Sequence, residues 1–323
     1  MTAPFLSLKD AIVRYDRLTA VDGVSLELRR GETLGLVGES GCGKSTIARA
    51  IVGLQPLTAG TISIEGETLQ DVSSQRRVNL QRRIQLLFQD PAASLSPRLR
   101  VQSLLAEPLK IRRAFVPENW ARIMAVAESI GLGEQLLPRY PHQLSGGQAR
   151  RVALVRALAA EPSIIVADEP TAGLDISVQG ELLNLLRALR DRLGLSYLLI
   201  SHNLNVVGRV TDRVAVMYLG QIVESGPTAT LFREPAHPYT QALLSVNLTL
   251  DANRRRERIV LSGELPSPSN PPAGCRFHKR CPLAQPKCAS EAPTLQAGAG
   301  GRSVACHFPL AAKPAVMPQP IAG

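Results

Sequence analysis

The chain has 323 residues, of which 45% are hydrophobic, 20% charged and only 4% aromatic, so we expect a globular protein with an aliphatic core. No apolar run approaches the ~18–20 residues that cross a bilayer, and the first residues do not have the pattern of a secretory signal. The formal charge of +10 is concentrated in the last 73 residues, which hold ten Lys and Arg against four Asp and Glu. We interpret this excess as a solvated basic tail, with anionic lipid headgroups as the alternative, and expect no nucleic-acid partner.

Short apolar runs predict the buried strands of a parallel sheet. They occur at residues 33–38, 163–168 and 196–201, and each is too short for a helix. The first run leads through glycines into a helix-compatible stretch from Lys44 to Gly53. Apolar residues at helical spacing over 177–194 predict a crossover helix that stops at Gly194. Strand, helix and strand together indicate an α/β fold.

The remaining segments suggest how the chain divides. Residues from about 92 to 160 turn helical and are punctuated by prolines, which predicts an α-helical insertion between two strands. Residues 213–226 are expected to form a hairpin that closes the domain, and prolines cluster again after residue 250, as in a linker. We therefore predict a core domain over 1–235, an extension over 236–310 and a disordered tail over 311–323.

A glycine-rich phosphate loop follows the first strand. The segment fits G-x-x-x-x-G-K-[ST] between a strand and a helix, a context that an ordinary glycine-rich turn would not explain. Its backbone N–H groups can converge on phosphate oxygens, and the helix N-terminus adds its positive end. Lys44 is expected to reach the β- and γ-phosphates, and Ser45 to bind Mg²⁺. The predicted nucleotide-binding residues are Gly38, Glu39, Ser40, Gly41, Cys42, Gly43, Lys44, Ser45 and Thr46.

Two acids close the second apolar run. Asp168 should lie at the carboxyl edge of the sheet beside the phosphate loop, where it can hold Mg²⁺ through water. Glu169 then points at the γ-phosphate and can orient or deprotonate the attacking water. A helix-capping pair is the alternative, but the phosphate loop upstream favours the catalytic interpretation.

The segment Leu144-Ser145-Gly146-Gly147-Gln148 lies shortly before this second strand. Here the sequence resembles the ABC ATPase family, whose signature is LSGGQ and whose core has the P-loop NTPase fold. The resemblance covers about residues 5–230. It implies that these residues form a second anion site at the start of a helix, which binds the γ-phosphate held by an opposite subunit. Hydrolysis would then require a head-to-tail dimer.

The same resemblance assigns roles to four further residues. Tyr15 stands in the place of the aromatic residue that stacks on adenine, and Asp175 matches the loop that crosses the dimer interface. Gln89 matches the glutamine that contacts Mg²⁺ and the attacking water and that senses the membrane subunits. His202 matches the switch histidine that contacts the γ-phosphate.

Two positions depart from the family's pattern. Ala172 and Gly173 replace the Ser-Ala pair usual in the interface loop, and Asn203 replaces the Asp that usually follows the switch histidine. Neither departure removes a phosphate or Mg²⁺ contact, so an active ATPase is expected.

Further segments narrow the resemblance to the ATPase subunits of bacterial dipeptide and oligopeptide importers. They are residues 88–98, 168–186, 236–246 and 275–284. This resemblance implies a second ATPase subunit, identical or different, two transmembrane permease subunits and an extracytoplasmic substrate-binding protein. The chain would lie peripherally on the cytoplasmic face of the inner membrane. Importers of nickel, glutathione or sugar derivatives are the alternative, and a soluble ABC ATPase outside transport is disfavoured.

The expected extension contains most of the cysteines. Cys275, Cys281, Cys288 and Cys306 have the spacing C-x5-C-x6-C-x17-C. In a reducing compartment, clustered thiols more often bind metal than form disulfides. Zinc sites favour C-x2-C pairs, which are absent from this segment, whereas four thiolates on loops also suit a [4Fe–4S] cluster. Subunits with this extension resemble ones that carry such a cluster. We expect the cluster, with Zn²⁺ or free thiols as alternatives and His278 or His307 able to replace a ligand.

Overall fold

The computed structural model describes residues 4–88, 94–246, 259–261 and 263–311. Its centre is a mixed sheet of eight strands in the order β11-β12-β10-β9-β3-β8-β7-β6. The strands from β9 to β6 are parallel to one another, and β10, β12 and β11 are antiparallel additions at one end. Their bounds are β3 Thr33–Val37, β6 Ile84–Leu87, β7 Ile164–Asp168, β8 Ser196–Ser201, β9 Arg213–Tyr218, β10 Gln221–Pro227, β11 Gln296–Ala297 and β12 Ser303–Val304.

The three strands predicted from apolar runs are confirmed, as β3, β7 and β8. Every side chain of β3 and β8 is buried, as are the first four of β7. β8 pairs in parallel with β3 on one side and with β7 on the other. Both faces of these strands are covered, so apolar residues are needed at every position rather than at every second one.

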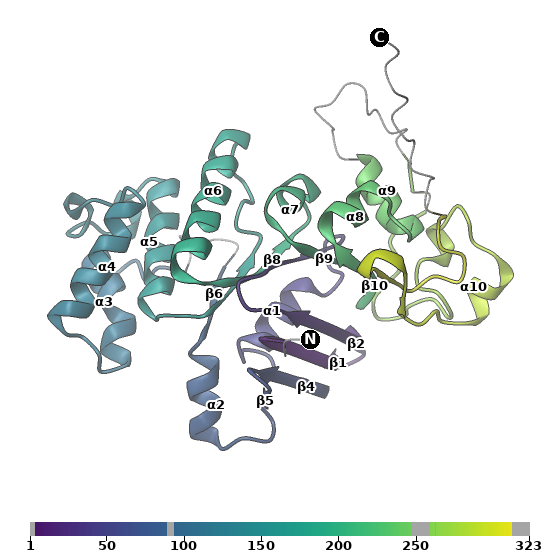
Figure 1. The fold of residues 1–323 in the computed structure, drawn as a ribbon, viewed down its shortest axis with the longest axis horizontal. Coiled ribbons are helices and arrows are strands. Elements are labelled where there is room, and N and C mark those ends of the chain that lie inside the picture. The colour runs from purple at the N-terminus through teal and green to yellow at the C-terminus, as the bar shows by residue number, and fades with distance from the viewer. Residues whose placement is uncertain (1–3, 89–93, 247–258, 262, 312–323) are drawn as a thin grey trace, which may run out of the picture.

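A second, antiparallel sheet packs against the central one through α1 (Lys44–Ile51) (Figure 1). Its strands are β1 Leu6–Tyr15, β2 Leu18–Leu28, β4 Ala59–Ile64 and β5 Glu67–Thr68. One hydrophobic core joins this sheet, the buried face of α1 with Ile47 and Ile51, and Leu36 and Val166 of the central sheet. The helix that begins at Lys44 is therefore fixed on both sides, which holds the preceding loop in place.

Three α-helices fall within the expected insertion, between β6 and β7 (Figure 1). The helices outside α1 are α2 Ser74–Gln81, α3 Val101–Ile111, α4 Pro117–Ser129, α5 Gly146–Ala159, α6 Ile176–Leu193, α7 Leu204–Val210, α8 Thr228–Arg233, α9 Pro238–Val246 and α10 Pro286–Ser290. α3, α4 and α5 share a core with the inner side of α6. α6 confirms the predicted crossover helix, and it ends at Gly194, which has the left-handed conformation with φ of 65°.

The last part of the chain is joined to the central sheet. β9 and β10 form the predicted closing hairpin, and β12 adds to β10 through the pairs Glu224↔Val304 and Ser225↔Ser303. Tyr239 of α9 packs edge-on against Tyr218 of β9, with 4.7 Å between ring centroids, and Phe277 packs 5.2 Å from Tyr218. The extension and the helical insertion lie at opposite ends of the molecule (Figure 1). Of the predicted disordered tail, only Ala311 is within the described residues.

The structure contains no helix long and apolar enough to cross a membrane in the part of the chain that it describes.

The contact between α7 and β3 allows a test of the fold. A Cβ atom added at Gly35 would lie 2.8 Å from Cγ1 of Val207 and 3.1 Å from Cγ2 of Thr211. Gly35→Ala should therefore overpack this contact and lower the free energy of unfolding by about 1–3 kcal/mol, measured by urea denaturation. Gly180→Ala on α6 is the matched control, because a Cβ there meets nothing within 4 Å. It should leave stability unchanged or raise it by up to about 1 kcal/mol. Equal effects of the two substitutions would contradict this packing.

Candidate functional site

A cavity of about 610 Å³ opens where the central strands end. The phosphate loop follows β3, Glu169 follows β7 and His202 follows β8, and these three strands are neighbours in the sheet. Carboxyl ends of adjacent parallel strands meet at one edge, which is the usual place for a ligand in such folds. The predicted residues that border the cavity are Tyr15, Gly38, Glu39, Ser40, Gly41, Gly43, Lys44, Ser45, Thr46, Glu169 and His202. The structure thus brings the predicted half-site for a nucleotide together.

Close backbone contacts explain two glycines of the phosphate loop. Gly43 has φ of 108°, and a Cβ there would lie 2.2 Å from the carbonyl oxygen of Ala20. A Cβ at Gly38 would lie 2.1 Å from the carbonyl oxygen of Met217. The loop therefore packs closely between the start of β2 and the end of β9. At these two positions there is no room for a side chain, so glycine is required.

Lys44 and Cys42 lie on the inner side of the loop. The buried Lys44 Nζ donates hydrogen bonds to the carbonyl oxygens of Gly38 and Glu39, both at 2.8 Å. Cys42 does not border the cavity but is buried beneath it, 3.7 Å from Lys44 Nζ, and burial raises the pKa of its thiol. The ammonium group thus takes its partners from the loop itself and can exchange them for phosphate oxygens.

Asp168, at the end of β7, has the features expected of a Mg²⁺ ligand. Its Oδ1 atom is inaccessible to solvent and has no hydrogen-bond partner within the described residues. Burial raises the pKa of this carboxyl group, while the nearby Ser45 hydroxyl and Lys44 ammonium act in the opposite direction. A buried carboxylate oxygen without a partner, beside a serine of the phosphate loop, fits a hard cation with oxygen ligands.

Glu169 and His202 contact each other directly. Glu169 Oε1 accepts a hydrogen bond from the His202 backbone N–H at 2.9 Å and lies 2.8 Å from His202 Nδ1. The Ser201 hydroxyl donates to Glu169 Oε2 at 3.4 Å. Glu169 has a left-handed backbone with φ of 50°, unusual for a residue with a side chain. In this structure the imidazole therefore holds the carboxylate to which the catalytic role was assigned.

The signature residues lie apart from this cavity. Ser145 caps α5: its hydroxyl accepts from the Gln148 backbone N–H at 3.2 Å, and Gln148 Oε1 accepts from the Ser145 N–H at 3.0 Å. Ser145, Gly146 and Gly147 are exposed, and none borders the cavity. The first N–H groups of an α-helix have no partner within it, so they can bind an anion supplied from outside. Within one chain, the predicted second anion site therefore lies apart from the phosphate loop.

The predicted interface loop lies beside the signature helix. Asp175 is exposed and stands as the N-cap of α6, without a side-chain capping bond. Arg150 of α5 donates to the carbonyl oxygen of Ala172 at 2.8 Å and so ties the two segments together. Gln89 lies outside the described residues, next to the exposed Phe88.

The tail cysteines border one small cavity of about 10 Å³, room for about one water molecule. Its lining includes Cys275, Cys281, Cys288, Cys306, His278 and His307. Burial raises the pKa of Cys306 to about 11. His278 Nδ1 lies 2.8 Å from the Cys275 carbonyl oxygen, and His307 Nε2 lies 2.9 Å from that of Glu291. No three or more His, Cys, Asp or Glu side chains among the described residues are arranged to hold one metal ion. The thiols thus converge without forming a ready metal site.

Residues of the extension that sequence reasoning missed reach the nucleotide cavity. Leu243 lines it, and the side chains of Tyr239 and Arg280 hydrogen-bond to Glu39 of the phosphate loop. The basic tail was interpreted as solvated, and for two residues this is wrong. The side chains of Arg276 and Arg280 are only 12% and 10% exposed, and they pair with Asp22 and Glu39. No sequence signal links residues so far apart along the chain.

Two family models match the chain. The model described as ABC transporter matches residues 21–172, and the model described as oligopeptide/dipeptide transporter, C-terminal region, matches residues 223–288. The dipeptide transport ATP-binding protein DppF of Haemophilus influenzae is 45% identical, over 92% of this chain and 91% of that protein. The oligopeptide transport ATP-binding protein OppF of Salmonella typhimurium is 46% identical, over 90% of this chain and 87% of that protein.

Solved structures of ABC transporter cassettes share the fold. The structure of cbiO1 from Clostridium perfringens, part of the ABC transporter complex cbiONQ, matches with a TM-score of 0.64 and 28% identity, covering 72% of this chain and 91% of that chain. The dimeric cassette MJ0796, bound to ADP and Pi, matches with a TM-score of 0.61 and 29% identity, covering 69% and 98%. The chain therefore belongs to the ATP-binding, ATP-hydrolysing subunits of ABC transporters, within the oligopeptide/dipeptide transporter family.

Proposed function

We propose that the chain hydrolyses ATP to power the import of dipeptides or oligopeptides across the cytoplasmic membrane. The observation that carries this proposal is the extent of the similarity. The relatives named for peptide transport align with about nine-tenths of the chain, through both the ATPase core and the C-terminal region. The subunit would lie peripherally on the cytoplasmic face of that membrane and serve a permease that receives its peptide from an extracytoplasmic binding protein.

The geometry supports the following roles in hydrolysis. Adenine would pack on Tyr15, which borders the cavity, and the phosphates would enter the loop from Gly38 to Thr46. Lys44 exchanges two backbone carbonyl oxygens for phosphate oxygens, so its charge is never left without a partner. Ser45, Asp168 and Gln89 would hold Mg²⁺, which would neutralise charge that develops on the β- and γ-phosphates.

A second ATPase subunit completes the site. The exposed Ser145, Gly146 and Gly147 of one subunit, with the half-buried Gln148, would meet the γ-phosphate held by the other. Asp175 would lie at the interface between them. Closure would draw His202 towards phosphate and free Glu169, which then accepts a proton from the attacking water.

Glu169→Gln tests the catalytic role. The amide oxygen can still accept the backbone hydrogen bond from His202, so the cavity should keep its shape and its affinity for ATP. It cannot accept a proton, so phosphate release should fall by about 100-fold or more. Turnover and nucleotide binding would be measured on the same membrane-reconstituted preparation. Turnover within about tenfold of the parent chain would refute the assignment.

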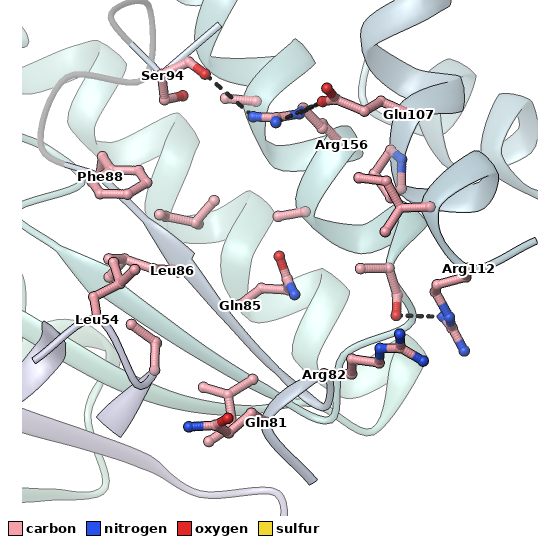
Figure 2. Close-up of a pocket in the computed structure, with 18 of the residues that line it drawn as sticks. Leu54, Gln81, Arg82, Gln85, Leu86, Phe88, Ser94, Glu107, Arg112 and Arg156 are labelled. Atoms are coloured by element: carbon pink, nitrogen blue, oxygen red, sulfur yellow. Dashed lines mark hydrogen bonds and ion pairs between the residues drawn. The ribbon is translucent and has the colours of Figure 1, made fainter. Parts of the chain in front are cut away.

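The permease subunits have a candidate docking groove on this chain. A cavity of about 490 Å³ lies between β6 and the helical insertion (Figure 2). Leu54 and Phe88, which line it, are 63% and 45% exposed, so this groove presents two large apolar side chains to solvent. Arg156 braces the opposite wall through Glu107 at 2.7 Å and the Ser94 carbonyl oxygen at 3.2 Å (Figure 2). We propose that a cytoplasmic segment of the permease binds here.

Phe88→Asp places a charge in this groove and should weaken the complex. The amount of permease that copurifies with the tagged chain from detergent-solubilised membranes should fall by about tenfold. Leu295→Asp is the matched control. Leu295, like Phe88, is a large hydrophobic residue exposed to a similar degree, at 42%, but it lies in the extension. Equal recovery of permease with both variants would argue against docking in the groove.

We also propose that the four tail cysteines hold a [4Fe–4S] cluster. All four thiols border one cavity, and four thiolates are the usual ligand set for such a cluster. The described residues do not form a ready metal site, so the proposal rests on the four thiols that line this cavity. Once bound, the cluster would cross-link segments within the extension, residues 236–310. The extension would thereby be stabilised next to the ATPase domain, residues 1–235.

Metal analysis tests the cluster directly. Anaerobically purified chain should contain about four irons and four acid-labile sulfides, and Cys306→Ser should lose most of both. Cys42→Ser is the control, because Cys42 lies beneath the phosphate loop and does not border the tail cavity. A colourless protein with one zinc per chain would overturn the proposal.

A further inference from the structure

Two residues of the C-terminal extension form hydrogen bonds with Glu39 in the phosphate loop of the same chain. The Glu39 backbone N–H donates a hydrogen bond to the Tyr239 hydroxyl at 3.0 Å. Its carboxylate accepts two hydrogen bonds from the Arg280 guanidinium, at 2.8 Å from Nη1 and 3.2 Å from Nη2. Such forked, charge-assisted pairs fix both the distance and the orientation of their partners.

The side chains of Tyr239 and Arg280 are themselves fixed by packing. Tyr239 is fully buried, 4.7 Å from the Tyr218 ring and 5.3 Å from the Phe277 ring. Arg280 is only 10% exposed on its side chain, lies 6.0 Å from the centre of the Tyr218 ring, and is 3.4 Å from the Tyr218 hydroxyl. These are not mobile surface groups, so a pair with Glu39 loses little side-chain freedom when it forms.

Glu39 is also held by Lys44, which under the proposed function turns towards the phosphates. Lys44 Nζ binds the carbonyl oxygens of Gly38 and Glu39, and these are the bonds that it exchanges for phosphate oxygens. Tyr239 and Arg280 are the groups that would still hold the first half of the loop after that exchange. Glu39 also borders the cavity, so without Arg280 its negative charge would face the triphosphate.

We propose that Arg280 and Tyr239 are positioning residues for ATP. Tyr239 fixes the backbone of Glu39, and Arg280 fixes and neutralises its carboxylate, so the extension is a structural part of the nucleotide site. The inference rests on the proposed use of this cavity for ATP. It predicts an effect on nucleotide affinity rather than on the chemical step, because both residues bind Glu39 and neither was assigned a role in hydrolysis.

Arg280→Met in the full chain tests the proposal. The affinity for trinitrophenyl-ATP, followed by fluorescence, should fall roughly fivefold to tenfold, and the KM for ATP should rise equally while kcat stays within about twofold. Adding Glu39→Gln to Arg280→Met should restore most of the lost affinity, because the uncompensated charge is then gone. Arg280→Lys keeps the charge but not the fork and should fall between the two. Tyr239→Phe removes only the hydroxyl and should weaken binding without disturbing the aromatic packing.

Arg276→Met is the matched control. Arg276 has a similarly low side-chain exposure of 12% and, like Arg280, stands next to a cysteine in the sequence. It pairs with Asp22 and the Leu219 carbonyl oxygen rather than with the loop. It should leave affinity unchanged. Equal losses in Arg276→Met and Arg280→Met, or unchanged affinity in Arg280→Met, would overturn the proposal. A parent chain that does not bind the nucleotide at all would instead refute the proposed function.

Discussion

The alignment of three neighbouring parallel strands is the constraint on which the rest of the site depends. β3, β8 and β7 pair in register, so that Val37 lies beside Ser201 and Asp168 lies beside Ile200. Each strand ends at the same edge of the sheet and is followed at once by a residue to which a role in the site was assigned. A shift of one residue in either pairing would turn every side chain of a strand to its other face and separate these groups.

Two reactive charges of the site, those of Lys44 and Glu169, have partners within the structure. Lys44 is bound by carbonyl oxygens of the loop, and Glu169 is bound by the backbone and ring of His202. A buried charge without partners is costly, so each group needs a partner before the nucleotide arrives. Binding then becomes an exchange of hydrogen bonds rather than the filling of an empty site, and this limits how far the loop must rearrange.

Sequence reasoning predicted the parts of the fold and the site that depend on local patterns. The apolar strands, the crossover helix ending at Gly194 and the phosphate loop each lie within a short stretch whose residue types fix its conformation. The position of Glu169 beside the loop was expected from the strand that it follows, and that of His202 from the resemblance to the ABC ATPase family; both residues border the cavity. The role of Gln89 stays a prediction, because that residue lies outside the described part of the chain.

Long-range contacts were the part that sequence could not predict. Arg280 and Glu39 are separated by 241 positions, and β12 has only two residues, too few to produce a periodic pattern. From the sequence, Arg276 and Arg280 cannot be distinguished from arginines that are exposed to solvent. Their partners, Asp22 and Glu39, lie in the first quarter of the chain. Burial of Arg276 and Arg280 could be recognised only from the folded structure.

The way the extension is attached has a consequence for the integrity of the molecule. β12 completes the central sheet beside β10, Phe277 packs between aromatic residues of β9 and α9, and two arginines anchor to the core. All of these contacts join residues on either side of the segment between Val246 and Ile259. Cleavage of a peptide bond in that segment would therefore break none of them. The two fragments would share one hydrophobic core and remain together as a nicked protein, with covalent continuity lost but the folded particle intact.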